Sequence, residues 1–476
     1  MKQYYENPLV ERYASKEMLE IFSPDHKFKT WRKLWIALAE SQKELGLPIT
    51  EEQLQELKEH IEDINYTVIS QKEKELRHDV MAHVYAYGEQ CPKAKPIIHL
   101  GATSAFVGDN ADIIIYTEAL KFIRKKLINA IDILTKFALK YKDLPTLGFT
   151  HFQPAQLTTV GKRACLWIQD LLIDLENIDF QLSKVRLRGV KGTTGTQASF
   201  LKLFDGDHEK VKKLDQLVSK KMGFDNSYKV TGQTYTRKWD SIILALLSGI
   251  AQSLHKFSND IRLLQHLKEV EEPFEKKQIG SSAMAYKKNP MRSERIGALS
   301  RYIIVNSLNP SLTASEQWFE RTLDDSANKR VSIPEAFLAT DSILSLCINI
   351  SSGLVVYERV IAQHIEKELP FMATENIIME GVKKGGDRQE LHERIRVHSM
   401  EAAKQIKIYG RKNDLLDRII NDEIFNLSID ELNKVMDPKN FIGRAPKQVE
   451  EFIYNDVQPI LEKNKDILGM EVKIYV

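Results

Sequence analysis

The clearest hydrophobic pattern lies in the middle of the 476-residue chain. Apolar or aromatic residues recur at spacings of three and four, at positions 113, 116, 120, 123, 127, 130, 134, 137 and 141. This spacing is a helical seam sustained over about 30 residues, or roughly 45 Å. Similar stripes predict further helices over about 155–187, 234–269, 291–308 and 333–367, and no strand pattern of comparable length competes with them. Helices this long must bury their seams together, so we expect an all-α bundle, with some seams left for contacts between subunits.

Shorter elements are expected on both sides of this bundle. The first hundred residues predict short helices, including one over 31–46 that ends at Gly46 and another over 71–88. Beyond about residue 357 the helices become short and charged. We therefore expect three domains: an N-terminal helical domain over 1–103, a central long-helix bundle over 104–356, and a C-terminal helical domain over 357–476.

Composition excludes several function classes. The net charge is only +2, so the chain has no basic field of the kind that binds nucleic acid. No apolar run approaches the length of a membrane span, and the N-terminus lacks the apolar stretch of a signal peptide. Three widely spaced cysteines indicate free thiols in a reducing compartment. His78 and His83 miss the spacing for sharing a metal on one helix face. We expect a soluble cytoplasmic protein that binds no nucleic acid, membrane or metal.

The most unusual segment covers 278–294 and reads QIGSSAMAYKKNPMRSE. Its first half lacks helical periodicity and carries two serines after Gly280, which predicts a mobile loop. Asn289 is predicted to cap a helix that starts at Pro290, so Lys287 and Asn289 would precede the positive end of a helix dipole. This arrangement is typical of a lid that closes over a carboxylate. It is also the local pattern of an ordinary surface loop before a capped helix.

Other unusual residues gather in the links between helices. The link at 98–110 places small hydroxyls between glycines, which suits either an oxyanion site or a plain turn. Taken alone, a histidine such as His151 at a predicted helix start is more often a capping or core residue than a catalytic one. Arginines such as Arg321 and Arg330, taken alone, are usually solvated surface residues in weak ion pairs.

Three of these segments together resemble the motif blocks of the fumarase/aspartase superfamily. They are GATS at 101–104, THFQPAQ at 150–156 and GSSAMAYKKNP at 280–290, in the same order as in that superfamily. Within it, RHD at 77–79, GQTYTRK at 232–238 and YKKNPMRSE at 286–294 are similar to the adenylosuccinate lyase family, and to its animal-type branch. The similarity extends over essentially the whole chain. One position departs from the family pattern: Ala285 stands where the family usually has proline. This replacement puts in question how the loop closes, but it removes no functional group.

The resemblance implies β-elimination of fumarate from adenylosuccinate, giving AMP, and from the succinyl-aminoimidazole-carboxamide ribotide of purine biosynthesis. It also implies a homotetramer with sites shared between subunits, and no metal or organic cofactor. The alternatives are a sister lyase acting on argininosuccinate or fumarate, and a non-catalytic structural relative. The residues around Lys287 favour the adenylosuccinate branch, and the presence of every proposed catalytic group disfavours the structural relative.

The resemblance also implies roles for individual residues. Ser281 is the expected base, His151 the general acid for the leaving nitrogen, and Lys287 a donor to the carboxylate on which charge develops. A serine is a poor base unless its alkoxide is stabilised, so burial of the loop beside Lys287 is required. His78 is expected to orient the substrate or support proton transfer. The expected substrate-binding residues are Arg12, Tyr13, Arg77, Asp79, Thr103, Ser104, Thr150, Gln233, Asn289, Arg321, Ser326 and Arg330.

Overall fold

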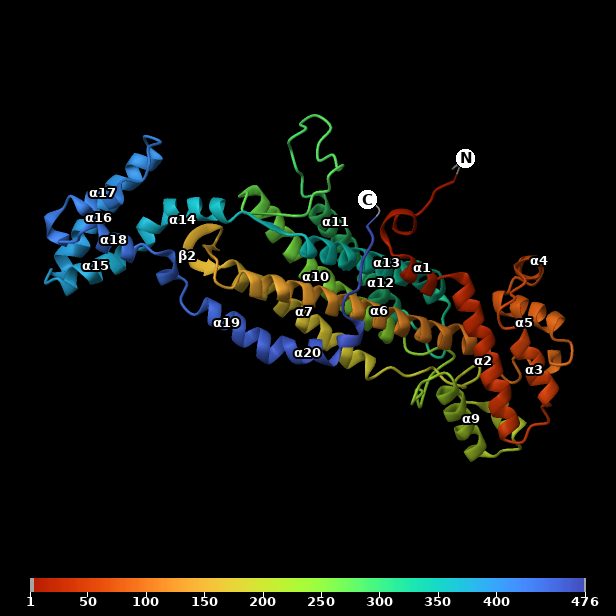
Figure 1. Cartoon of the computed structure of the whole chain (residues 1–476). Coiled ribbons are helices and arrows are strands. Elements are labelled where there is room, and N and C mark those ends of the chain that lie inside the picture. Colours follow the sequence, from red (N-terminus) through yellow and green to blue (C-terminus); the bar gives the residue numbers. More distant parts are fainter. Residues whose placement is uncertain (1–3, 475–476) are drawn as a thin grey trace.

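A computed structural model describes residues 4–474 of the chain as a long helical bundle with a smaller group of helices at each end (Figure 1). The bundle helices are α6 (Ser104–Lys140), α7 (Val160–Leu182), α10 (Lys238–His266), α11 (Met291–Asn306), α12 (Leu308–Ser315) and α13 (Asp324–Ser352). Within the described residues, strands form only two short antiparallel pairs. The expected all-α class is confirmed.

Helix α6 runs through the centre of the bundle and carries the predicted seam. Ile113, Leu120, Ile123 and Leu127 on that seam are all fully buried. The helix has 37 residues and is therefore about 55 Å long. Its first residue, Ser104, and the chain that follows Lys140 consequently lie at opposite ends of the bundle (Figure 1). This separation decides which of the predicted site residues can meet within one chain.

A β-hairpin follows α6, where the sequence predicted a loop and the start of a helix. Strand β1 (Pro145–Thr150) pairs with β2 (Gln153–Thr159), and α7 begins at Val160 rather than near residue 155. The two turn residues, His151 and Phe152, have φ values of 53° and 57°. Two-residue hairpin turns favour positive φ at both central positions and usually use Asn or Gly there. The expected helix start is therefore wrong, and His151 sits in a strained turn.

Two other predicted helices are each interrupted. The stretch predicted over 71–88 forms α4 (Tyr66–Leu76) and α5 (Asp79–Gln90), because Arg77 adopts a left-handed conformation between them. The stretch predicted over 333–367 belongs to α13, which begins at Asp324, and to α14 (Glu358–Met372). Between α13 and α14, β4 (Val355–Val356) pairs with β3 (Val270–Glu271).

Further helices form both ends of the molecule (Figure 1). At the amino end, the helix predicted over 31–46 is the later part of α2 (Pro24–Glu44). The remaining helical segments before the bundle are η1 (Leu9–Tyr13), α1 (Lys16–Ile21), α3 (Glu51–Glu59) and η2 (Lys95–Ile97). Between α7 and α10 lie α8 (Ala198–Leu203) and α9 (His208–Lys221), and α9 packs against α2.

The carboxyl-terminal part has a core of its own. Ile377, Leu391, Leu415 and Phe425 form its centre. Its helices are α15 (Thr374–Lys383), α16 (Arg388–Lys407), α17 (Leu415–Ile420), η3 (Glu423–Phe425), α18 (Ile429–Val435) and η4 (Pro438–Phe441). The chain then returns along the bundle as α19 (Ala445–Phe452), η5 (Ile453–Val457), α20 (Gln458–Lys463) and η6 (Lys465–Ile467), where Val449 joins the main core. The domain limits at 103 and 356 stay predictions.

Helix α13 is the one helix among the described residues that is long and apolar enough to cross a membrane. In its most apolar window, 83% of the residues are buried inside the protein. Its apolar surface is thus covered by the other bundle helices, as expected for a core helix.

Candidate active site

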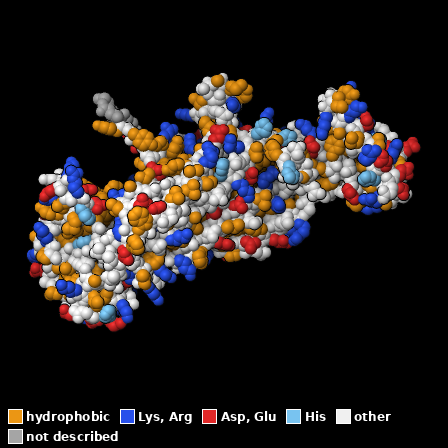
Figure 2. Space-filling view, turned by 180° about the vertical axis from the view of Figure 1, so that it is seen from behind, with side chains coloured by type: hydrophobic (Ala, Val, Ile, Leu, Met, Phe, Trp, Pro, Cys, Tyr) orange, Lys and Arg blue, Asp and Glu red, His pale blue; other side chains and the backbone are white. Residues whose placement is uncertain are grey.

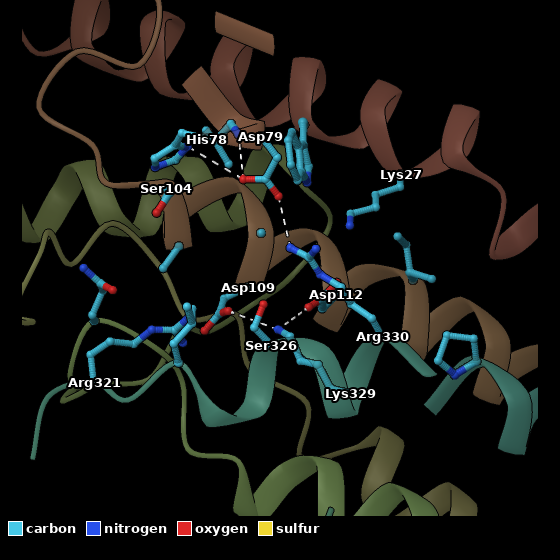
Figure 3. Close-up of a pocket in the computed structure, with 18 of the residues that line it drawn as sticks. Lys27, His78, Asp79, Ser104, Asp109, Asp112, Arg321, Ser326, Lys329 and Arg330 are labelled. Carbon is cyan, nitrogen blue, oxygen red and sulfur yellow. Dashed lines mark hydrogen bonds and ion pairs between the residues drawn. The ribbon is translucent and has the colours of Figure 1, made fainter. Parts of the chain in front are cut away.

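A pocket of about 680 Å³ lies at the amino-terminal end of the bundle (Figure 3). The break between α4 and α5, the start of α6 and the start of α13 meet there. The pocket brings together eight of the predicted site residues: Arg77, His78, Asp79, Ser104, Gln233, Arg321, Ser326 and Arg330.

The break before α5 directs His78 and Asp79 into this pocket. His78 caps α5, and its Nδ1 accepts the backbone N–H of Met81 at 3.3 Å. This bond assigns Nε2 as the donating nitrogen of the neutral ring. Asp79 Oδ2 accepts a hydrogen bond from Arg330 Nη2 at 3.0 Å, which joins the break to α13. The break that the sequence pattern missed is thus what positions both side chains.

The start of α6 forms another wall. Thr103 occupies the cap position without a capping side-chain bond, and its Oγ1 accepts a hydrogen bond from Gln233 Nε2 at 3.4 Å. The first peptide N–H groups of a helix have no partner within the helix and favour anions. The loop expected at 98–110 ends at Thr103, because Asp109 and Asn110 belong to α6.

Beneath the pocket, buried charges hold α6, α10 and α13 together. Arg237 is fully buried and lies 2.9 Å from Asp109 Oδ1 and 2.6 Å from Asp325 Oδ2. Lys329 Nζ lies 2.6 Å from Asp112 Oδ2 and 3.6 Å from Asp109 Oδ1. Burial alone would raise the pKa of Asp109, but the charges of Arg237 and Lys329 outweigh it and hold that pKa below its usual value. This network fixes the helix that carries Ser326 and Arg330.

The predicted lid lies elsewhere, in a loop that projects from the bundle before α11 (Figure 1). Its two ends cross closely, since a Cβ at Gly280 would lie 2.1 Å from the carbonyl oxygen of Lys287. Asn289 Nδ2 donates to the carbonyl oxygen of Gly280 at 2.7 Å and closes this neck. Ser281 Oγ accepts the N–H of Met284 at 3.1 Å, and the side chain of Lys287 is exposed.

The expected role of Asn289 as a helix cap is wrong. Pro290 occupies the cap position of α11, and the buried carboxylate of Glu272 accepts the N–H groups of Arg292 at 3.0 Å and Ser293 at 2.9 Å. The positive end of this helix is therefore already neutralised by the protein's own carboxylate. The anion that the structure places at this helix start is therefore Glu272, and binding of a substrate carboxylate by Lys287 and Asn289 stays a prediction.

Thr150 and His151 lie at the exposed tip of the hairpin, beyond the far end of α6. Arg12 and Tyr13 lie in a third place, in a small depression shared with Arg295 and Ser342. The guanidinium of Arg295 is 5.5 Å from the centre of the Tyr13 ring. Ser342 is three helical turns beyond Arg330 on α13, or about 18 Å away. Within one chain, Arg12 and Tyr13 therefore lie outside the pocket that contains Arg330.

Two family models match the chain. One is described as lyase and matches residues 13–304, and the other is described as adenylosuccinate lyase C-terminus and matches residues 370–452. Adenylosuccinate lyase of Saccharomyces cerevisiae is 56% identical over 476 residues, covering 99% of both chains. The chain belongs to the adenylosuccinate lyase family. The family member of Schistosoma mansoni is 51% identical, again over 99% of both chains.

Solved structures agree with this family's fold. The 3-carboxy-cis,cis-muconate lactonizing enzyme of Pseudomonas putida aligns with a TM-score of 0.81 at 20% identity. The alignment covers 94% of this chain and 98% of that one. At this identity the likeness concerns the fold alone.

In this member of the family, sequence reasoning missed several residues of the pocket. Lys27, Asp109, Asp112 and Lys329 line it and were not predicted. Lys329 could have been found, because it is adjacent in sequence to the predicted binding residue Arg330. Asp109 and Asp112 could be recognised only once α6 was known to begin at Ser104. Nothing in the sequence near Lys27 marks it as a pocket residue.

Proposed function

We propose that the chain catalyses β-elimination of fumarate from adenylosuccinate, giving AMP, and from the succinyl-aminoimidazole-carboxamide ribotide of purine biosynthesis. The observation that carries this proposal is 56% identity to an adenylosuccinate lyase over 99% of both chains. The pocket supports it, because guanidinium groups and hydroxyls from α13 and the start of α6 suit a substrate with one phosphate and two carboxylates. Neither a metal nor an organic cofactor is part of the proposal.

The chemistry assigned to the side chains follows from the reaction. Removal of a weakly acidic C–H beside a carboxylate places negative charge on that carboxylate, so fixed donors around it lower the barrier. Lys287 and Thr150 are proposed as such donors. Ser281 is proposed to take the proton, and its Oγ already accepts one N–H in the loop, from Met284. His151 is proposed to protonate the leaving nitrogen, since imidazole titrates near neutral pH.

These groups require more than one copy of the chain. One chain holds His78 in the pocket, Ser281 in the projecting loop and His151 at the hairpin tip. We therefore propose a homotetramer in which each site takes its pocket, loop and hairpin from different subunits.

The bundle offers apolar surface for this assembly. Leu166, Ile173 and Phe180 recur every seven residues on α7 and are 45%, 51% and 58% exposed. Figure 2 shows hydrophobic side chains along the exposed length of the bundle.

The three cysteines support a reducing, cytoplasmic location as part of the proposal. Cys91, Cys165 and Cys347 are all buried and unpaired in the described residues. Free thiols persist where glutathione and thioredoxin keep them reduced.

Incubation of the purified protein with adenylosuccinate tests the activity directly. We expect the absorbance of adenylosuccinate to fall while fumarate and AMP appear in equal amounts. Argininosuccinate and fumarate serve as alternative substrates, and neither is expected to turn over. Fumarate release from argininosuccinate, or hydration of fumarate, without turnover of adenylosuccinate would assign the chain to a sister activity.

A further inference from the structure

Lys27 is a cation of the pocket that belongs to none of the ion pairs described above. Lys27 lies near the start of α2, and its side chain enters the pocket from the side opposite α13 (Figure 3). Figure 3 shows its ammonium group directed toward the region that Arg330 and Asp112 face from below.

The ammonium of Lys27 has no carboxylate partner in the described residues, a feature that it shares among the pocket's cations only with the exposed Arg77. Three other cations of the pocket each contact a carboxylate, at 3.0, 2.6 and 3.2 Å: Arg330 with Asp79, Lys329 with Asp112, and Arg321 with Asp325. For Lys27, no carboxylate oxygen of residues 4–474 lies within 4.0 Å. Its nitrogen is instead 5.3 Å from the centre of the Trp31 ring and 5.7 Å from that of Phe28. These are weak cation–π contacts that do not replace an ion pair.

The surroundings of Lys27 disfavour its charge when the pocket is empty. Burial lowers the pKa of Lys27, and the charges of Arg330 and Lys329 lower it further. Asp112 and Asp79 oppose this shift only in part, and both already bind another cation. A partly buried ammonium without an ion partner costs free energy that an incoming anion would relieve.

We propose that Lys27 is a substrate-binding residue that contacts the phosphate group of the nucleotide. This proposal rests on the proposed function, because that function requires a substrate with a phosphate group. A phosphate monoester carries nearly two negative charges at neutral pH and offers three acceptor oxygens, so it can bind several cations at once. Lysine binds phosphate well as a point charge. The donors assigned to the reacting carboxylate, Lys287 and Thr150, lie in the loop and the hairpin rather than beside Lys27 in this chain.

Replacement of Lys27 by methionine tests the proposal. Met is close in length to the aliphatic part of the lysine side chain, and it removes the ammonium group with its charge and its N–H donors. We expect the Kd of AMP, measured by titration calorimetry, to rise about tenfold or more. Inhibition by fumarate, which has no phosphate, should change less than about twofold, because Lys27 would not contact it. The control is Lys33→Met, an exposed lysine on the same helix outside the pocket, which should leave both constants unchanged.

The melting temperature distinguishes binding from a structural role. Without ligand, Lys27→Met should melt at or above the temperature of the wild-type protein, since it removes a partly buried charge that has no carboxylate partner. A lower melting temperature together with equal weakening of AMP and fumarate would overturn the proposal. Loss of fumarate inhibition with unchanged AMP binding would also overturn it, and would assign Lys27 to a carboxylate.

A second variant, Arg330→Ala, separates failure of this inference from failure of the site. Arg330 belongs to the same pocket, so its removal should also weaken AMP while sparing fumarate. If Arg330→Ala weakens AMP and Lys27→Met does not, the inference about Lys27 is wrong and the phosphate site stands. If neither variant weakens AMP, the phosphate lies outside this pocket, and the wild-type assay with adenylosuccinate still decides the function independently.

Discussion

Ser281→Ala is expected to lower kcat about a hundredfold or more while KM changes little. The reason is that Ser281 is proposed to take the proton in the transition state, so its loss slows the chemical step more than it weakens substrate binding. Ser281 is partly buried near the neck of the loop, and its Oγ accepts the N–H of Met284. An oxygen that already receives a hydrogen bond is better able to carry negative charge. Steady-state kinetics of fumarate release provide the measurement.

Ser282→Ala is the matched control, since Ser282 is adjacent, exposed and makes no hydrogen bond of its own in the described residues. It should retain kcat within a few-fold of the wild type. If kcat falls a hundredfold in Ser282→Ala and not in Ser281→Ala, the base is Ser282 and the assignment of Ser281 is wrong.

His151→Asn is expected to lower kcat by about a hundredfold, because it removes the proposed general acid. Asn is chosen because it tolerates the positive φ of 53° that His151 adopts in the hairpin turn. The pH profile of kcat provides a second measurement. The part of the profile that reflects titration of the His151 imidazole should be absent in the variant. If His151 had a purely structural role, the substitution would lower kcat at every pH without changing the shape of the profile. Retention of that part of the profile would assign the acid to another residue.

The fold was largely predictable where helices are long and their buried faces continuous. The seam from Ile113 to Phe137 predicts α6 because every turn of this helix contributes buried side chains. The hairpin at 145–159 was missed, since its strands are short and rich in threonine and glutamine, and its turn uses His151 and Phe152 instead of the usual Asn or Gly. The break at Arg77 was missed for a similar reason, because neither Gly nor Pro marks it.

The candidate site was predictable in its members and not in its geometry. The family resemblance implied His78, Ser104 and Arg330 as site residues, and the fold places them in one pocket. They could not show that Ser281 and His151 lie outside it, because that depends on the length of α6 and the position of the loop. The prediction that Asn289 caps α11 was wrong, because Glu272 accepts the first N–H groups of that helix instead. Glu272 is too far away in the sequence for a local pattern to reveal this contact.

A working site is proposed to combine residues from different copies of the chain. Subunit exchange between His78→Ala and Ser281→Ala proteins tests it most directly, since each variant alone should be nearly inactive. In an equal mixture, about a quarter of the sites should receive both intact residues, because each site draws them independently from two subunits. We therefore expect about a quarter of the wild-type activity to return after exchange. No recovery, with exchange proven by mass spectrometry of differently labelled subunits, would place His78 and Ser281 in one chain's site and contradict the account.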